Sequence, residues 1–204
     1  LFMCILKASA KVSSIGIPFI SIFATLVASG IVQVPHRLYE ECAHSYPMIK
    51  TMTVSLTLVK DLDLPIEADT ITPSHFAGKS SAEIGKLQVL QGNQFLPLAD
   101  FFKVSGKAGD AADGTEISVA GDLRKVKMIG KGMNGGKISV EGDVGMYLGA
   151  EMIAGRIHVK GSVGPWAAAE MQGGNIQIEG DAGDRLCSGY RGSIEGMIGG
   201  RVYV

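Results

Sequence analysis

The sequence predicts a mainly β fold: a right-handed parallel β-helix of glycine-rich coils, with about 19 residues per coil, preceded by a small α+β block. Two observations predict it. Glycine is concentrated late in the chain, with 20 glycines among residues 121–204 against 8 among residues 1–120. Within that late part, glycines and β-branched residues recur at intervals of 19 residues. A short fixed period is typical of solenoids, in which each repeat contacts its neighbours.

Three segments supply the strands of the repeat. Residues 137–141, 156–160 and 175–179 alternate polar with β-branched apolar residues, as a strand with one buried face does. Each segment is followed by a glycine, which enters crowded or left-handed turns without steric cost. We expect the coils to stack at about 4.8 Å and to bury a column of Ile and Val. The recurring positions are Ile138, Ile157 and Ile176; Val140, Val159 and Ile178; and Gly142, Gly161 and Gly180.

A phosphate-binding loop is the alternative interpretation of the glycines. Such a loop places its glycines once, between a strand and a helix, together with Lys-Ser/Thr or a distal acid. Here the glycines recur in every coil and no amphipathic helix pattern follows them. We therefore favour the repeat, in which methionines that precede successive strands form a second internal column. They are Met133, Met152, Met171 and Met197.

The sequence divides into a small α+β domain at residues 52–114 and a repeat domain at 115–204, joined near 108–114. The repeat domain is predicted to be truncated, because the chain ends inside a strand-like pattern. In the first domain, residues 53–58 alternate polar and apolar side chains, which indicates a half-buried strand. Residues 66–71 are predicted to form its antiparallel neighbour.

Local signals place two short helices and a turn in the same domain. Thr72-Pro73 combines an N-cap with proline at the start of a helix, and Ser80-Ser81-Ala82-Glu83 has the spacing of a capping box. Gln91-Gly92-Asn93 is a turn signal. Bulky apolar residues at 98–104 are expected to pack a small core.

Residues 1–51 form an apolar leader. Residues 12–34 carry no charge and are long enough to span a bilayer as a helix, although proline and glycine weaken the segment. Three interpretations stay open: translation upstream of a true start at Met52 or Met48, a membrane anchor, and a buried soluble helix. We favour the first.

Charge and cysteine content exclude other classes of protein. The net charge is −1, with 19 basic and 20 acidic residues dispersed along the chain, so no patch indicates nucleic-acid binding. Cys4, Cys42 and Cys187 lie far apart and lack the close spacing of zinc or iron–sulfur ligands. They are predicted to be free thiols in a reducing compartment, the cytoplasm.

A few residues carry side chains suited to chemistry or binding. Glu151 and Glu170 occupy matching positions one coil apart and could form the carboxylate pair of an acid–base site. We favour instead that they are exposed or paired with cations of a partner. Trp166 and Tyr190 interrupt a pattern of small residues, and aromatic residues on a coil edge often anchor a partner.

Other polar residues favour structural roles. His75 lies beside a phenylalanine and, like Asp100, is expected to be structural. His158 and Cys187 have no second ligand at the coil spacing, so neither predicts a metal site. Aspartates in the glycine turns are expected to accept hydrogen bonds from local backbone amides. These are Asp143, Asp181 and Asp184.

Longer motifs resemble the C subunit of formylmethanofuran dehydrogenase. The resemblance rests on residues 142–152 (Gly-Asp-Val-Gly-Met-Tyr-Leu-Gly-Ala-Glu-Met) and 52–58 (Met-Thr-Val-Ser-Leu-Thr-Leu). The motifs Phe-Ala-Gly-Lys-Ser at 76–80 and Asp-Phe-Phe at 100–102 add to it. It extends over residues 52–204.

Two other families have a similar repeat: the C-terminal domain of the glutamate synthase large subunit, and the C subunit of the bacterial formyltransferase/hydrolase complex. The block at residues 52–106 favours the formylmethanofuran families over glutamate synthase.

The resemblance implies a structural subunit of an archaeal oxidoreductase complex that reduces carbon dioxide with methanofuran to formylmethanofuran, in methanogenesis or its reverse. It implies that molybdopterin or tungstopterin, iron–sulfur clusters and a binuclear metal site belong to partner subunits. No catalytic, cofactor-binding or metal-binding residue is therefore predicted in this chain. The expected partners are the other subunits, without nucleic acid, and without a membrane unless residues 12–34 are an anchor.

Overall fold

The structure is a computed structural model that describes residues 51–204. The predictions for the leader, including the apolar run at 12–34, lie outside the described residues. Residues 51–204 belong to one compact unit. Within residues 51–204, no helix is both long enough and apolar enough to cross a membrane.

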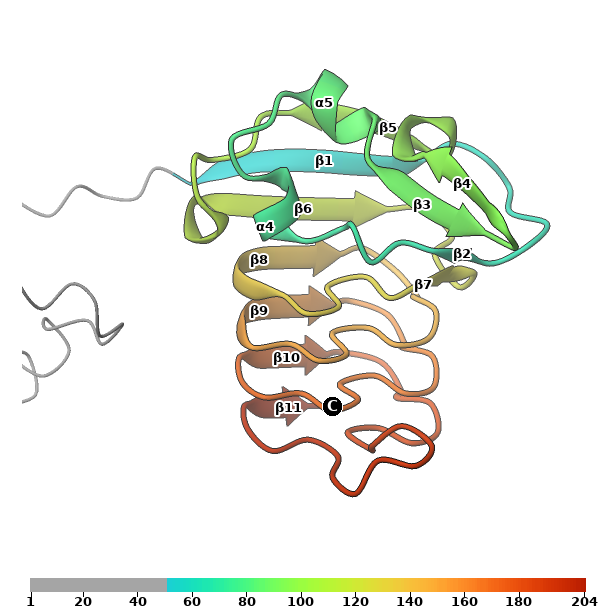
Figure 1. The fold of residues 1–204 in the computed structure, drawn as a ribbon, viewed down its shortest axis with the longest axis vertical. Helices are drawn as coiled ribbons and strands as arrows, with labels where there is room; N and C mark the ends of the chain where they lie inside the picture. Colours follow the sequence, from blue (N-terminus) through green and yellow to red (C-terminus); the bar gives the residue numbers. More distant parts are fainter. Residues whose placement is uncertain (1–50) are drawn as a thin grey trace, which may run out of the picture. The chain divides into compact units, whose positions relative to one another are not determined.

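The described part is mainly β with a few short helices, as predicted (Figure 1). The strands are β1 (Met52–Leu58), β2 (Ile66–Glu67), β3 (Gln88–Gln91), β4 (Gln94–Pro97), β5 (Phe102–Gly106), β6 (Thr115–Ala120), β7 (Val126–Lys127), β8 (Asn134–Val140), β9 (Ala154–Val159), β10 (Asn175–Ile178) and β11 (Arg201–Tyr203). The helices are α4 (Pro73–Phe76), α5 (Ser81–Gly85) and the 3-10 turns η1 (Leu98–Asp100) and η2 (Ala112–Gly114).

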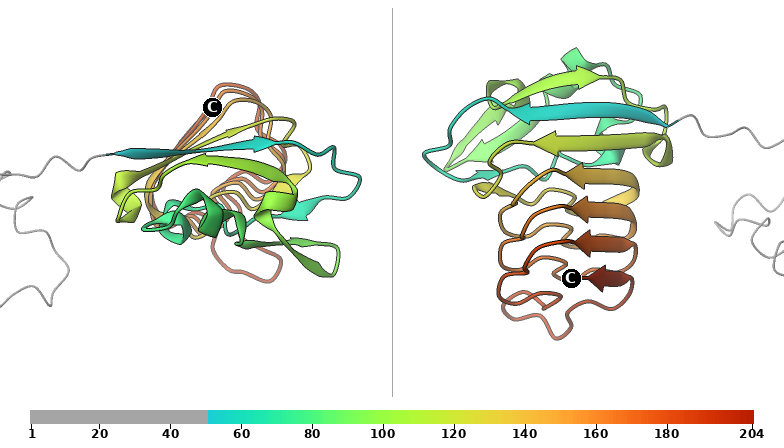
Figure 2. Two further views of the ribbon diagram at one scale, coloured as in Figure 1. Left: turned by 90° about the horizontal axis from the view of Figure 1, so that it is seen from above. Right: turned by 180° about the vertical axis from the view of Figure 1, so that it is seen from behind.

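Two mixed sheets contain these strands. The larger has seven strands in the order β11-β10-β9-β8-β6-β1-β5, and only the β1–β5 pair in it is antiparallel. The smaller has four strands in the order β4-β3-β2-β7, with β2 and β7 parallel and the other pairs antiparallel. Four consecutive parallel strands, β8 to β11, lie one above another with their connections stacked beside them (Figures 1 and 2).

The 19-residue register predicted from sequence is confirmed. Ile138 pairs with Ile157 and Ile157 with Ile176, so that equivalent positions of successive coils are direct neighbours. A second contact runs along the stack through isolated parallel bridges from Val144 to Val163 and from Val163 to Ala182. Each coil is therefore bonded to the next on two sides.

The interior of the stack consists of matched apolar columns. Ile138, Ile157 and Ile176 are at most 1% exposed. Of the predicted methionine column, Met133, Met152 and Met171 are fully buried, while Met197 is partly buried against the core. A continuous apolar interior of this kind stabilises the stack, since each strand covers its neighbour's apolar side chains.

Gly161 permits the coils to approach closely. A Cβ atom at this position would lie 2.5 Å from the carbonyl carbon of Gly142, closer than non-bonded heavy atoms can come. Gly142 itself has room, because its nearest atom, the Gly121 carbonyl oxygen, would be 3.8 Å away. Glycine is therefore required at position 161, whereas position 142, its equivalent in the preceding coil, has room for a Cβ atom.

The predicted helix signals act as expected. Thr72 caps α4, with its hydroxyl oxygen accepting a hydrogen bond from the His75 amide at 3.3 Å. Ser80 and Glu83 form the predicted capping box at the start of α5. These caps satisfy amide groups that have no partner within the helix. The bulky residues of the 98–104 segment lie in the core, including Leu98, Phe101 and Phe102.

The predicted pairing of residues 66–71 with residues 53–58 is wrong. Only Ile66–Glu67 is extended, and β2 pairs with β3 and β7 in the smaller sheet. β1 lies between β5 and β6, and six of its residues are in register with β6. A longer alternating segment offers more ladder hydrogen bonds and more cross-strand packing than the two-residue β2. The large sheet thus contains strands from both sides of residue 114, since β1 precedes that residue and β6 follows it. The division into two domains at residue 114 stays a prediction.

Candidate functional site

One outward face of the stack is built from large side chains on left-handed backbone. Tyr147 and Trp166 have φ values of 62° and 65°, and Glu151 and Glu170 have 58° and 52°. This conformation costs a residue with a Cβ atom about 1 kcal/mol or more. Gly132, with φ of 63°, occupies the position equivalent to Glu151 in the preceding coil and avoids this cost. Strained positions of this kind cluster at binding and catalytic sites.

Backbone hydrogen bonds between coils hold the main chain at these residues in place. The Tyr147 amide donates to the Pro165 carbonyl at 3.1 Å, and the Glu151 amide donates to the Ala169 carbonyl at 2.7 Å. The Trp166 amide donates in the same way to the Asp184 carbonyl at 2.9 Å. Leu148 and Ala150, between Tyr147 and Glu151, and Met152, which follows Glu151, are buried. The alternation of inward and outward side chains thus fixes which residues form the face.

Three aromatic rings form a cluster on this face. The centroids of Tyr147 and Trp166 lie 6.0 Å apart with nearly parallel rings, and those of Trp166 and Tyr190 lie 6.3 Å apart. Tyr147 and Tyr190 are also 6.0 Å apart. The Arg185 guanidinium lies 4.9 Å from the centroid of the Trp166 ring, within range of a cation–π interaction.

The two glutamates predicted to be neighbours lie beside this cluster, and both accept hydrogen bonds from Tyr190. Its hydroxyl donates to Glu151 Oε1 at 2.9 Å, and its backbone amide donates to Glu170 Oε1 at 3.1 Å. Lys131 Nζ lies 3.4 Å from the same oxygen of Glu151. We call Tyr147, Trp166, Tyr190, Glu151 and Glu170 the aromatic–carboxylate face.

Tyr190 stays a hydrogen-bond donor to a higher pH than an ordinary tyrosine does. Burial of the side chain and, after it, the hydrogen bond to Glu151 raise the pKa of Tyr190 well above its ordinary value, because a phenolate would be poorly solvated and would face a carboxylate. The phenol therefore stays protonated. Both glutamates are engaged by groups of their own chain, an arrangement that suits a structural contact better than proton transfer.

Tyr190 begins an insertion in the repeat. Met197 follows Met171 by 26 residues instead of 19, so this coil carries seven additional residues, 190–196. The Met197 amide closes the loop by donating to the Cys187 carbonyl at 2.9 Å, and the Ser193 amide donates to the Tyr190 carbonyl at 3.0 Å. We call residues 190–196 the insertion loop.

The prediction that the turn aspartates accept hydrogen bonds from local amides is wrong for Asp143, whose partner lies in the next coil. Asp143 Oδ1 accepts a hydrogen bond at 2.8 Å from the Ser162 amide, which lies one coil further on instead of in the same turn. The Asp181 amide continues the ladder by donating to Ser162 Oγ at 3.1 Å. Such bonds join consecutive coils directly, so the turns stabilise the stack and not only themselves.

The remaining candidate residues have structural surroundings. His158 Nε2 lies 2.8 Å from Glu179 Oε1, its neighbour across the coils. His75 Nδ1 lies 2.7 Å from Thr72 Oγ1 at the start of α4. Cys187 is a free thiol whose partial burial raises its pKa and lowers its reactivity. No group of three or more His, Cys, Asp or Glu suited to a metal occurs among residues 51–204.

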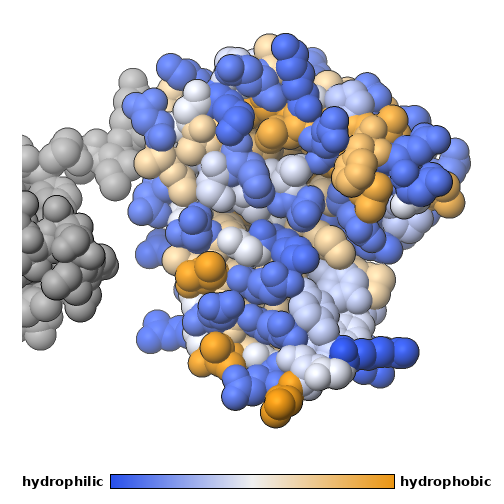
Figure 3. All heavy atoms as spheres, viewed as in Figure 1, coloured by the Kyte–Doolittle hydropathy of each residue, from blue (hydrophilic) through white to orange (hydrophobic). Residues whose placement is uncertain are grey.

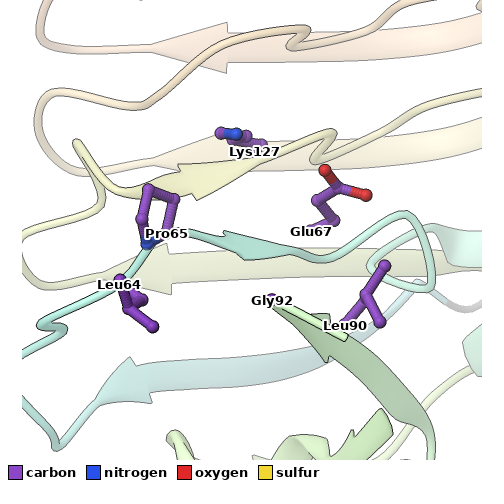
Figure 4. A pocket seen from close by; sticks show the side chains of 6 residues that line it. All are labelled: Leu64, Pro65, Glu67, Leu90, Gly92 and Lys127. Atoms are coloured by element: carbon purple, nitrogen blue, oxygen red, sulfur yellow. The ribbon is translucent and has the colours of Figure 1, made fainter. Parts of the chain in front are cut away.

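Two hollows lie away from this face. One of about 190 Å³ lies between β2, β3 and β7, where Glu67 and Lys127 of neighbouring strands line it with Leu64, Pro65, Leu90 and Gly92 (Figure 4). Hydrophobic side chains gather on the surface near β3 and β4 (Figure 3). Phe95 of β4 is 68% exposed. The other hollow, of about 470 Å³, lies beside α5 and β5 and is lined by Gly85, Ala99 and Phe102.

Sequence reasoning identified Glu151 and Glu170 as a pair and Trp166 and Tyr190 separately, and it missed Tyr147, Lys131 and Arg185. Tyr147 and Arg185 stand 19 residues before and after Trp166. The 19-residue spacing was therefore sufficient to predict that these two residues lie beside Trp166. Lys131 belongs to no such series, and only the structure brings it to Glu151.

Comparison with known proteins found no matching family model. Over 89 residues the chain is 49% identical to the C subunit of molybdenum-containing formylmethanofuran dehydrogenase 1 of Methanosarcina barkeri, covering 44% of this chain and 30% of the relative. Over 97 residues it is 44% identical to the C subunit of tungsten-containing formylmethanofuran dehydrogenase 2 of Methanothermobacter marburgensis, covering 48% of this chain and 36% of the relative. The chain thus spans about one third of the length of these relatives.

A solved structure has a similar fold. It is the formyltransferase/hydrolase complex of Methylorubrum extorquens with methylofuran, matched with a TM-score of 0.65 and 34% identity over 72% of this chain and 54% of the other. The chain is therefore similar to the C subunits of molybdenum- and tungsten-containing formylmethanofuran dehydrogenases, which confirms the resemblance predicted from its sequence.

Proposed function

We propose that the chain is the structural C subunit of a formylmethanofuran dehydrogenase complex, which reduces carbon dioxide with methanofuran to formylmethanofuran. The stack of coils acts as a right-handed parallel β-helix that holds other subunits in position. The observation that carries this proposal is the identity of 44–49% to the C subunits of such enzymes. The matched 19-residue coils support it as well.

The bonding of the stack supports a scaffold role. Charged side chains on the outer face of the large sheet pair between neighbouring coils, as Lys160 does with Glu141 at 2.7 Å and Lys137 with Glu116 at 2.7 Å. Exposed pairs of this kind add little stability. They give the surface alternating charge, which suits contacts with large polar partners.

The chemistry of the complex then lies in other subunits. The molybdopterin or tungstopterin, the iron–sulfur clusters and the binuclear metal site are proposed to belong to partner chains, and no catalytic residue is assigned here. The engagement of Glu151 and Glu170 by Tyr190 supports this division. A cytoplasmic location and the division at residues 51 and 114 are part of the same proposal.

The test is purification of the full chain, carrying a tag, from its native host. The expected result is recovery of other dehydrogenase subunits in stoichiometric amounts, together with formylmethanofuran dehydrogenase activity. Recovery of the chain alone, while the activity fractionates elsewhere, would overturn the proposal. Gly161→Ala, expected to disrupt the stack, serves as the control that should recover no subunits, whereas Gly142→Ala should recover them all.

A second candidate is the C subunit of a formyltransferase/hydrolase complex, favoured by the structural match to the complex from Methylorubrum extorquens. The two candidates differ in redox chemistry. Elemental analysis of the purified complex separates them, since the presence of molybdenum or tungsten supports the dehydrogenase. A complex without either metal, active in formyl transfer, supports the second candidate.

A further inference from the structure

The large sheet has an open edge at β5. β5 pairs with β1 on one side, and among residues 51–204 its other side has no strand partner beyond an isolated bridge between Ser80 and Lys107. This edge lies at the end of the sheet away from β11, with α5 beside it (Figures 1 and 2). An open edge offers backbone N–H and C=O groups to another extended chain.

The pairing with β1 determines which backbone groups β5 offers. In an antiparallel pair, alternate residues bond to the partner strand and the residues between them face the other way. The Lys107 amide donates to the Thr53 carbonyl at 3.3 Å, so the odd-numbered residues of β5 bond toward β1. Phe102 and Val104 therefore turn their N–H and C=O groups to the open side.

A hollow of about 470 Å³ lies against this part of the edge. Phe102 and Val104 line it together with small residues that include Gly85 of α5 and Ala99. Val104 is in register with Leu56 of the core, so its side chain lies on the inner face of the sheet. On that face the hollow has room for small apolar side chains.

The outer face of the same edge is basic. Lys103 is exposed and in register with Thr57, which is also exposed, and Lys107 follows it on the chain. Lys86 of α5 also lines the hollow, and none of the lining residues is acidic. Within residues 51–204, none of these three lysines forms an ion pair.

Lysine on an edge strand also protects a sheet against indiscriminate pairing, but that role requires no hollow beside the strand. In the hollow between β2, β3 and β7, Lys127 is accompanied by Glu67, whereas the hollow at β5 has lysines alone. A second copy of this chain is a poor occupant, because pairing of two β5 edges would bring lysines of like charge together. The charge of the edge therefore favours an acidic partner.

We infer that the edge of β5 binds an extended acidic segment of another protein, which adds a strand to the large sheet. Its backbone bonds to Phe102 and Val104, its acidic side chains lie beside Lys103 and Lys107, and the small apolar side chains between them enter the hollow. Alternation of acidic and apolar residues follows from the period of two of a strand. The inference goes beyond the proposed function, and its test needs no other subunit.

The probe is a fluorescent peptide, Glu-Val-Glu-Val-Glu-Val-Glu, whose binding to the full chain is followed by fluorescence anisotropy. A peptide with Lys in place of each Glu tests the role of charge. The acidic peptide with methylated backbone nitrogens tests the role of the strand ladder, because it lacks N–H donors. We expect the dissociation constant of each control peptide to be about tenfold or more above that of the acidic peptide.

Lys103→Glu should raise the dissociation constant of the acidic peptide by about tenfold or more, because it places like charges side by side. Lys86→Glu, on the α5 side of the hollow, is a second variant with the same expected result. Lys160→Glu makes an equal change of charge at an exposed lysine next to β9 and should raise the constant less than about twofold. Circular dichroism spectra equal to that of wild type show that the variants are folded.

Equal affinity for the acidic and basic peptides, or no loss on methylation, overturns the inference. Equal losses in Lys103→Glu and Lys160→Glu do so as well, and so does a wild-type chain that binds no acidic peptide. Recovery of dehydrogenase subunits from the native host is measured separately. A failure of peptide binding therefore leaves the proposed function standing.

Discussion

The phenol of Tyr190 donates a hydrogen bond at 2.9 Å to Glu151, a residue 39 positions earlier in the chain. This contact reaches past the adjacent coil to the one before it, while the Tyr190 amide bonds to Glu170 in the adjacent coil. The insertion loop is therefore tied to two coils at once. Its conformation depends on the stack as well as on its own sequence.

Replacement of Tyr190 by Phe tests the hydrogen bond to Glu151. The ring contacts remain, while Glu151 loses a donor, so we expect the free energy of unfolding to fall by about 1 kcal/mol or less, since the site is partly open to water. Urea unfolding of both proteins, followed by circular dichroism, measures the difference. A Phe variant that is more stable than wild type would contradict a stabilising bond.

The same bond predicts a dependence on alkaline pH. Burial, with the hydrogen bond to Glu151, raises the pKa of Tyr190 in the folded protein. The protonated phenol is thus favoured by folding, so its contribution is fully present below the ordinary tyrosine pKa of about 10 and is lost as pH rises through the higher folded value. The stability difference between wild type and Tyr190→Phe should be constant from neutral pH to about 10 and shrink above it.

Phenolate absorbance provides an independent measurement. The chain has five tyrosines, and Tyr190 should ionise at higher pH than an ordinary one. The difference between the titrations of wild type and Tyr190→Phe isolates its contribution. A difference curve centred near the ordinary tyrosine pKa would contradict the buried, hydrogen-bonded phenol.

The recurring glycines Gly142 and Gly161 predict very different losses of stability for the same substitution to alanine. Gly161→Ala places a Cβ atom 2.5 Å from backbone of the neighbouring coil, so we expect a loss of more than about 2 kcal/mol or failure to fold. Gly142→Ala meets nothing closer than 3.8 Å and should change stability by less than about 1 kcal/mol. Thermal unfolding of both variants gives the comparison. Similar melting temperatures would mean that the coils do not approach as closely as described.

The methionine column predicts a further pair of effects. Met152 is fully buried between equivalent residues of adjacent coils, and Met152→Ala should cost about 2–5 kcal/mol because a cavity remains. Met146, six residues earlier, is partly exposed, and its replacement by Ala should cost about 1 kcal/mol or less. Denaturant midpoints measure both values. Equal losses would contradict the inward orientation of the column.

The sequence was sufficient for the parts of the fold that depend on local or periodic signals. The alternation at residues 53–58, the capping box at Ser80 and the column through Ile157 depend on neighbours in the chain or on a fixed period, and each is present. The strand partner of residues 53–58 could not be predicted in this way. A period of two indicates a strand but does not specify its neighbour, and β6 contributes a longer matching edge than β2.

The candidate site was predicted only in pieces. Trp166 and Tyr190 were recognised as exceptions to the small-residue pattern. Their contact depends on the insertion loop, and an insertion is hard to recognise in a glycine-rich sequence. The left-handed backbone at Glu151 could not be expected either, because glycine is the usual residue for that conformation. Interactions between coils determine this backbone conformation. The conformational preference of a residue and its neighbours in sequence does not reveal such interactions.

The fixed register along the stack has a consequence for distance. Each coil advances the structure by one strand spacing, about 4.8 Å, without turning the recurring positions onto another face. The distance between a site near β6 and a site near β11 is therefore a whole number of strand spacings. Deleting one complete coil, residues 142–160, should shorten that separation by one step, whereas deleting a few residues more or fewer should destroy the alignment of every coil that follows.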